Sequence, residues 1–208
     1  MNRKNKRGFT LVELIVVLVI LAILASLLIP ALTGYVTKAK KQAVITEARD
    51  VWTASQAALT ECYALYPESF NDKSNSCRFT ITVNGKTYKN VGRITNGALH
   101  AIQKKPNDKT EAGSSSRRVA AQVLKYLESD GKNPRYTFGN GGLISSAIKP
   151  SAYFNGNPKK TDVIIQIFHT KEGRIVAINF AKDGYMATIV PGQETTCEYD
   201  GACIASKG

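Results

Sequence analysis

The sequence has few of the residues that usually carry catalysis or hold metal ions. It contains only two histidines, His100 and His169, and its four cysteines include no Cys-x-x-Cys pair, so a metal site is not expected. It also lacks the Gly-x-Ser-x-Gly, His-Glu-x-x-His and Walker patterns, and the Asn-Gly-Gly turn at residues 140–142 is not followed by a lysine and a helix start. We therefore expect no cofactor, and nothing in the sequence marks an enzyme.

Acidic residues are also scarce beside basic ones. The 208 residues include 28 Lys and Arg but only 16 Asp and Glu, which gives a formal charge of +12. An excess of this kind favours anionic partners such as nucleic acid, teichoic acid or a membrane surface. An ordinary solvated surface accounts for the same excess, so both interpretations stay open.

One long stretch near the N-terminus has almost no polar side chains. Between residues 14 and 29 the only one is Ser26, and a helix over residues 9–32 would be roughly 36 Å long, enough to cross a bilayer. Four cations precede the stretch, which keeps that flank in the cytoplasm and directs the rest of the chain outward. Glu13 lies near its start, at a cost of about 3 kcal/mol in lipid, and therefore indicates a partner for its charge.

A secretory signal peptide and a plain signal anchor both fit this hydropathy. However, no good small-x-small cleavage site follows the apolar run, and the run is longer than the core of a typical signal peptide. Neither interpretation accounts for the sequence Gly-Phe-Thr-Leu-Val-Glu at residues 8–13.

This hexapeptide, together with the short basic leader, the apolar run and Pro30, resembles the N-terminus of a type IV pilin precursor. The resemblance covers roughly the first sixty residues, and its motif is highly specific. It implies that a prepilin peptidase cuts between Gly8 and Phe9 and then methylates the new amino group of Phe9. It also implies that the apolar helix is kept and forms the core of a filament.

The predicted role of Glu13 rests on the charge that this cleavage creates. The amino group of Phe9 would enter the apolar filament core, where it needs a counter-charge, and Glu13 of a neighbouring subunit can supply it. Such a pair would set the axial register of the subunits rather than add much net stability. The alternative is that the Glu13 carboxylate lies among the lipid headgroups.

Pro30 and Gly34 predict a weak zone in the helix. Proline in a helix interior removes a backbone hydrogen bond and clashes with the preceding turn. Members of the family carry a proline here, and the helix around it can kink or partly unwind. This sequence has Ala22 where many members have glycine, which leaves open how far such unwinding would extend toward the N-terminus. Alternatively, Pro30 only marks the end of the membrane span.

From residue 33 onward the pattern becomes amphipathic. Apolar or small side chains recur in steps of three and four, Trp52 widens this stripe, and Pro67 ends the helix after Tyr66. Such a stripe needs a sheet to cover it. Its members are Val44, Ala48, Val51, Ser55, Ala58, Cys62 and Leu65.

The rest of the chain predicts a sheet. Residues 79–83 and 86–91 form a hairpin around Asn-Gly, and three later strands are joined by short turns into an antiparallel meander. The expected fold class is α+β, with one long N-terminal helix packed on an antiparallel sheet. The other expected elements are strands at 162–169, 174–180 and 185–190, helices at 98–104 and 116–129, and a loop at 105–116.

Four cysteines in an exported chain predict two disulfides. Pairing of sequence neighbours, Cys62 with Cys77 and Cys197 with Cys203, is the simplest of the three connectivities. The first of these bridges would contribute about 3 kcal/mol by constraining the unfolded chain. In many pilins a disulfide ties the C-terminal region to the sheet, so crossed pairing also stays open.

The sequence therefore predicts a leader at residues 1–8, a membrane and filament-core helix at 9–32, and a globular head at 33–208. The leading hypothesis is a structural subunit of an extracellular type IV pilus that serves adhesion, aggregation or surface motility. The alternatives are a type II secretion pseudopilin, a DNA-uptake pilin, and a membrane-anchored binding module that does not polymerise.

The resemblance also implies where the chain resides and what it meets. Before assembly it would be a single-pass protein of the cytoplasmic membrane with its head outside, and afterwards part of a pilus on the cell surface. The implied partners are further copies of the same chain, the prepilin peptidase, and an assembly platform with its ATPase.

Overall fold

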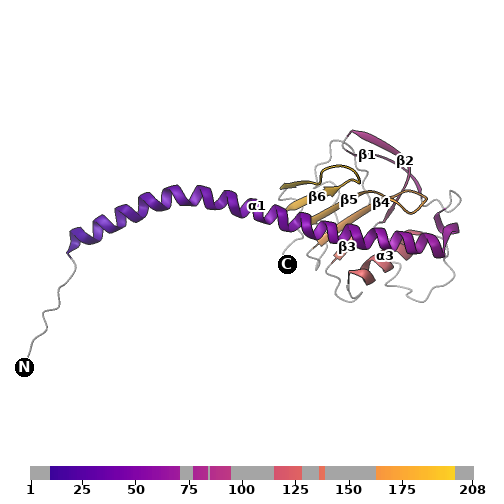
Figure 1. Ribbon diagram of the computed structural model, residues 1–208, viewed down its shortest axis with the longest axis horizontal. Coiled ribbons are helices and arrows are strands. Elements are labelled where there is room, and N and C mark those ends of the chain that lie inside the picture. Colours follow the sequence, from indigo (N-terminus) through magenta and orange to yellow (C-terminus); the bar gives the residue numbers. More distant parts are fainter. Residues whose placement is uncertain are drawn as a thin grey trace, which may run out of the picture. The chain divides into compact units, whose positions relative to one another are not determined.

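The computed structural model describes residues 10–70, 77–83, 85–94, 115–127, 136–138 and 163–199. Contacts within the chain divide it into two compact units, Met1–Lys40 and Lys41–Gly208. A single helix, α1 (Leu11–Leu65), begins in the first unit and ends in the second (Figure 1). The predicted boundaries after residues 8 and 32 stay predictions.

The sequence explains both ends of α1. Thr10 caps the first turn, and the helix ends just before Pro67, which has no backbone N–H with which to continue it. A short 3₁₀ helix, η1 (Pro67–Phe70), follows. Between these ends Leu and Ala favour the helix, and Pro30 lies inside it without ending it.

The second unit is built on one sheet, whose described strands follow the order β1-β2-β4-β5-β6-β7 with antiparallel neighbours throughout. The exception is β3, which pairs in parallel with β4. The predicted α+β class, a long helix on an antiparallel sheet, is confirmed. The bounds are β1 (Cys77–Val83), β2 (Lys86–Ile94), α3 (Ser115–Tyr126), β3 (Tyr136–Phe138), β4 (Val163–His169), β5 (Ile175–Lys182), β6 (Tyr185–Ile189) and β7 (Thr196–Tyr199).

The predicted hairpin, meander and second helix therefore form, with bounds that differ by a few residues. The turn between β5 and β6 is Asp183-Gly184, whose φ values of 52° and 79° give the tight two-residue turn that Asp-Gly favours. Sequence analysis missed β3 and β7. The predicted helix at 98–104, the turn at 140–142 and most of the predicted loop at 105–116 lie outside the described residues.

The main core lies between α1 and the sheet. Leu65, predicted to face the core, is 61% exposed because it lies beyond Cys62, the last buried residue of α1. Leu59, which the stripe did not include, is fully buried, so the buried face is wider than one residue per turn. The other predicted stripe residues are all buried: Val44, Ala48, Val51, Ser55, Ala58 and Cys62.

A side-chain amide of α1 fixes the helix on the sheet. Gln56 Nε2 donates to the backbone oxygen of Gly173 at 2.9 Å, and its Oε1 accepts from the backbone N–H of Ile175 at 3.0 Å. Gly173 lies in the connection between β4 and β5, and Ile175 is the first residue of β5. The amide therefore satisfies two backbone groups at that turn and sets the register of α1 against the sheet.

The central strands β4 and β5 are buried on both faces. On the face away from α1, Asn179 donates to Gln166 at 3.1 Å and accepts from Thr188 at 2.9 Å, which makes a polar row across three strands. A second apolar cluster lies beside this row. It comprises Ile81, Val83, Val91, Phe168, Val176, Ala177 and Val190.

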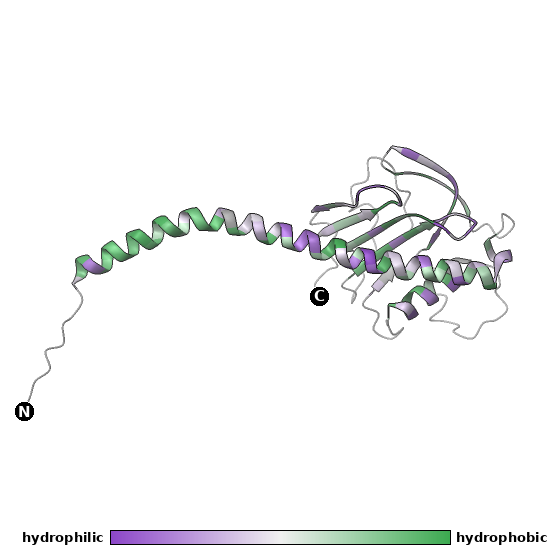
Figure 2. Ribbon diagram, in the orientation of Figure 1, coloured by the Kyte–Doolittle hydropathy of each residue, from purple (hydrophilic) through white to green (hydrophobic). Residues whose placement is uncertain are grey.

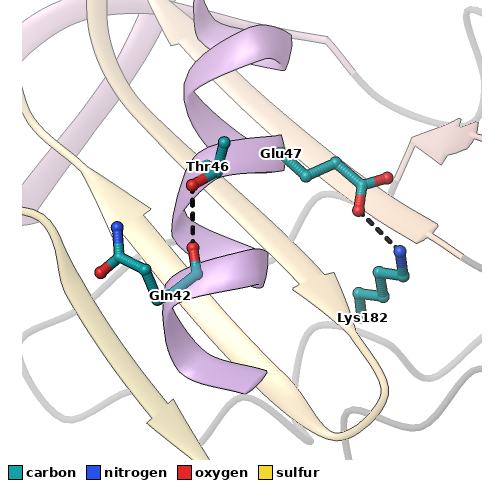
Figure 3. Close-up of polar contacts among 4 residues, drawn as sticks. All are labelled: Gln42, Thr46, Glu47 and Lys182. Carbon is teal, nitrogen blue, oxygen red and sulfur yellow. Dashed lines mark hydrogen bonds and ion pairs between the residues drawn. The ribbon is translucent and has the colours of Figure 1, made fainter. Parts of the chain in front are cut away.

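Two further polar contacts tie α1 to the head. The carboxylate of Glu47 lies 2.6 Å from Lys182 Nζ of β5, and the preceding residue, Thr46, donates its hydroxyl to the Gln42 carbonyl (Figure 3). Near the other end of α1, Glu61 accepts hydrogen bonds of 2.6 Å from both Gln122 and Tyr126 of α3.

Candidate functional site

The candidate site is the apolar surface of α1 in the first unit. From Thr10 to Lys40 every side chain that the structure describes is exposed, although residues 11–32 are almost entirely hydrophobic (Figure 2). Its most apolar window has a mean hydropathy of 3.2, and α1 is long and apolar enough to cross a membrane. An exposed apolar surface of this extent needs lipid or another protein to cover it.

The only carboxylate in this surface is held by its own helix start. Glu13 Oε2 accepts from the backbone N–H of Thr10 at 2.8 Å and from its hydroxyl at 2.7 Å, while the Glu13 N–H donates to Thr10 Oγ1 at 3.3 Å. This reciprocal arrangement is a capping box. It places the Glu13 carboxylate beside residue 10, one peptide bond from the predicted new N-terminus at Phe9.

The zone around Pro30 remains helical in the structure. Ser26 Oγ donates to the carbonyl of Ile23 at 2.7 Å, and Thr33 Oγ1 donates to the carbonyl of Pro30 at 2.9 Å. Hydroxyl groups that bond back in this way often bend helices. Gly34 has open space around its Cα. The predicted kink or unwinding at Pro30 and Gly34 stays a prediction.

The predicted disulfides also stay predictions. The described cysteines, Cys62, Cys77 and Cys197, are not joined to one another, and Cys203 lies outside the described residues. Burial raises the pKa of the Cys62 thiol to about 11, and the nearby Glu61 carboxylate acts in the same direction. The thiolate of Cys62 is therefore disfavoured in the folded head, which makes it a slow nucleophile.

One buried group was not recognised from the sequence. His169 at the end of β4 has no exposed surface, its Nδ1 lies 2.9 Å from the carbonyl of Thr170, and its ring packs against Phe70 with centroids 5.7 Å apart. A Cβ on Gly92 would lie 2.4 Å from His169 Cε1 and 2.9 Å from Cys77 Sγ. Burial lowers the pKa of His169 to about 4. A lone histidine in a sequence carries no signal of such burial.

No metal centre is formed by the part of the chain that the structure describes. In these ranges no group of three or more His, Cys, Asp or Glu side chains is close enough together to hold an ion. The predicted cleavage site, Gly8 and Phe9, lies outside the described residues. The assignment of these two residues therefore depends on the sequence.

Comparison with known proteins bears on this same segment. Residues 3–29 match the family model of the prokaryotic N-terminal methylation motif. The N-terminus is of the prepilin type. The resemblance to type IV pilins and pseudopilins that the sequence predicts is thereby confirmed, and the match covers the leader and most of the apolar run.

A curated relative provides a second similarity. The chain is 51% identical over 47 residues to the type II secretion system core protein G of Klebsiella michiganensis. This alignment covers 23% of the chain and 33% of the relative, so the chain spans about a third of that protein's length. No solved structure matches the chain. The family-model match lies at residues 3–29, in the leader and the apolar part of α1, and the head is described by its own structure.

Proposed function

We propose that this chain is a structural subunit of an extracellular type IV pilus, assembled through the apolar half of α1. The observation that carries the proposal is an exposed hydrophobic helix with one carboxylate, Glu13, in its first turn, directly after a prepilin-type motif. The head then forms the filament surface and serves adhesion, aggregation or surface motility. We assign the chain no catalytic role.

The proposed pathway begins in the cytoplasmic membrane. The basic leader stays in the cytoplasm, the apolar helix spans the bilayer, and the head lies outside. A prepilin peptidase removes residues 1–8 after Gly8 and methylates Phe9. Removal of four cations lowers the formal charge of the chain from +12 to +8. An assembly platform and its ATPase then transfer the helix from lipid into the filament.

In the filament, Glu13 has a specific electrostatic task. The cationic amino group of Phe9 from one subunit and the Glu13 carboxylate of its neighbour are both costly to bury alone, and pairing offsets both desolvation penalties. The capping box with Thr10 supports this role because it holds the carboxylate close to the helix start. A charge pair inside an otherwise apolar bundle fixes the axial register of the packed helices.

A second candidate is a pseudopilin of a type II secretion system. The similarity to core protein G favours it, although the alignment covers only 47 residues, 23% of this chain. Those residues make up a smaller share of this chain than of the relative, so this chain is longer. The longer head is the feature that favours a pilus here. A DNA-uptake filament is a further alternative within the same architecture.

The experiment is to shear filaments from the cell surface, image them, and determine the intact mass of their main protein. We expect filaments composed of this chain, starting at an N-methylated Phe9. An uncleaved chain in filaments, or a start after Thr33, would contradict the processing proposed here. Loss of secreted enzymes without loss of surface filaments, after deletion of the chain, would instead favour the pseudopilin.

A further inference from the structure

The two edges of the head sheet carry charges of opposite sign. Between residues 77 and 94, which form the β1–β2 hairpin, the sequence has four cations and no acidic residue. Between residues 183 and 199, which include β6 and β7, it has three acidic residues and no cation. β1 and β7 are the two ends of the described strand order, so these segments lie at opposite edges of one sheet (Figure 1).

Two of the cations at the first edge, Lys86 and Lys89, are exposed. They form no ion pair with any residue that the structure describes. Lys86 lies 5.3 Å from the ring centroid of Tyr88, a contact that leaves its charge in place. Both lysines lie on β2, the strand next to the edge strand β1, and we call them the basic edge.

The opposite edge has matching carboxylates. Glu194 and Glu198 are exposed and likewise form no ion pair within the described ranges; we call them the acidic edge. The charge of Lys41 in α1 acts on the thiol of Cys197, where it opposes the rise in pKa that burial causes. Side chains alternate along β7, so the next residue, Glu198, points to the other face of the sheet from Cys197. Lys182, the cation closest in sequence, is already paired with Glu47.

Protection of sheet edges does not explain this distribution. Charged side chains on edge strands prevent unwanted pairing between sheets, and charges of either sign serve this purpose, so protection alone does not require opposite signs. Opposite signs on the two edges attract a second copy instead. A contact between different patches of identical chains is heterologous, and when it does not close into a ring it generates an open helical array.

We propose that the basic edge of one head docks against the acidic edge of the head of a neighbouring copy in the filament. The partner is thus a second copy of this chain, and the inference rests on the proposed filament function. A nucleic acid bound at the basic edge is the competing occupant. Nucleic-acid binding would depend on the lysines alone, and charge changes at Glu194 and Glu198 would not affect it.

The test is charge reversal and exchange in the full-length chain. We expect Lys86→Glu with Lys89→Glu, and separately Glu194→Lys with Glu198→Lys, each to reduce sheared filament by at least about tenfold, because like charges then meet at the contact. All four substitutions in one chain should restore most of the yield. Co-expression of the two defective variants should restore it as well, since each then supplies the edge that the other needs.

The matched control is Lys125→Glu with Lys171→Glu, which makes the same change in net charge at exposed positions outside both edges and should leave the yield near normal. Full yield from either edge variant, or defects that neither exchange nor co-expression relieves, would overturn the docking contact. Loss of DNA retention by the lysine variant with normal filaments would assign the basic edge to nucleic acid. If the unaltered chain forms no filament, the proposed filament function itself fails. If the unaltered chain forms filaments and the edge variants also give full yield, only the docking contact fails.

Discussion

In the first half of α1, up to Lys40, every described side chain is exposed, whereas the second half buries a continuous stripe against the sheet. The backbone is the same helix in both halves, so the difference lies in what surrounds it. The second half is stabilised by its own chain, and the first half has an apolar surface that lipid or another protein must cover. Substitutions in the first half should therefore affect assembly, and those in the second half folding.

The largest expected effect concerns Glu13. Glu13→Ala should leave the membrane fraction unchanged or slightly higher, because it removes a carboxylate from the apolar helix. In the filament it leaves the neighbour's Phe9 amino group without its counter-charge, at a cost of about 3–5 kcal/mol per subunit. We expect sheared filament to fall by more than about tenfold, as measured by immunoblot beside the membrane fraction and leader cleavage.

The controls for this prediction are Glu13→Gln and Val17→Ala. Glu13→Gln keeps the shape but removes the charge and should behave like Glu13→Ala, whereas Val17→Ala should assemble nearly normally. A membrane anchor that does not polymerise would show no difference among the three. Normal filament from Glu13→Ala would refute the register role of this carboxylate.

A matched pair of leucines tests the comparison directly. Leu59 has no exposed surface, and Leu18 is 58% exposed on the same helix. Leu59→Ala should lower the free energy of unfolding of the head by about 2–5 kcal/mol, while Leu18→Ala should not change it. The chain has a single tryptophan, Trp52, which packs against the core, so its fluorescence during denaturation in detergent reports the head alone. Equal effects of the two substitutions on the free energy of unfolding would contradict the difference between the two halves of α1.

The pH dependence of the head should come largely from His169. Burial lowers its pKa from 6.5 to about 4. As the pH falls below 6.5, His169 therefore binds a proton in the unfolded chain but stays neutral in the folded head. This contribution to stability is complete above pH 6.5 and is lost progressively down to about pH 4, roughly 3 kcal/mol in all. Denaturant midpoints between pH 7 and 4 should show the decline, and His169→Gln should remove that part of it.

A smaller effect is expected at Gly92, where the backbone of β2 lies close to the side chains of His169 and Cys77. A Cβ at Gly92 would overlap with the ring of His169 and crowd Cys77 Sγ, so the strands must shift to admit it. Gly92→Ala should therefore destabilise the head by about 1–3 kcal/mol, measured by thermal unfolding. Gly34→Ala meets nothing within 4 Å and serves as the control, with no loss of head stability. An equal response from both glycines would contradict the packing described for Gly92.

Local patterns predicted α1, the β1–β2 hairpin and the three strands of the meander, because their hydrophobic periodicity and turn residues act over a few positions. β3 could not be predicted in this way. It has three residues and owes its existence to parallel pairing with β4, a contact distant in sequence. β7 is mostly exposed, so it lacks the alternation that marks a half-buried strand.

The functional residues differ in the same way: some could be predicted from local sequence, and others depend on contacts that only the fold creates. The predicted cleavage motif and Glu13 could be predicted from the sequence because they lie together in one short linear segment, residues 8–13. The burial of His169 and the opposite charges of the two sheet edges depend on the strand order, which residues 77–94 and 183–199 do not encode locally. The exposed position of Leu65 likewise depends on where the covered part of α1 ends, not on its periodicity.

The smallest expected effect concerns Glu47, a carboxylate in the second half of α1. Its pair with Lys182 is short, at 2.6 Å, but both side chains keep some exposure, 17% and 25%. Partly exposed pairs gain little because water and salt screen them, so we expect a coupling of only about 0.5–1 kcal/mol. A double-mutant cycle with Glu47→Gln and Lys182→Met, followed by Trp52 fluorescence, measures it.

The coupling should shrink further at 1 M salt, and filament yield should remain near normal in all three variants. This outcome would separate two glutamates on one helix by their surroundings. Glu47 has its counter-charge within its own head, where water screens the pair, and so contributes modestly to folding. In the proposed filament, Glu13 finds its counter-charge in a neighbour, within an apolar core, and is therefore expected to control assembly. A filament defect in Glu47→Gln as large as that in Glu13→Ala would contradict this division.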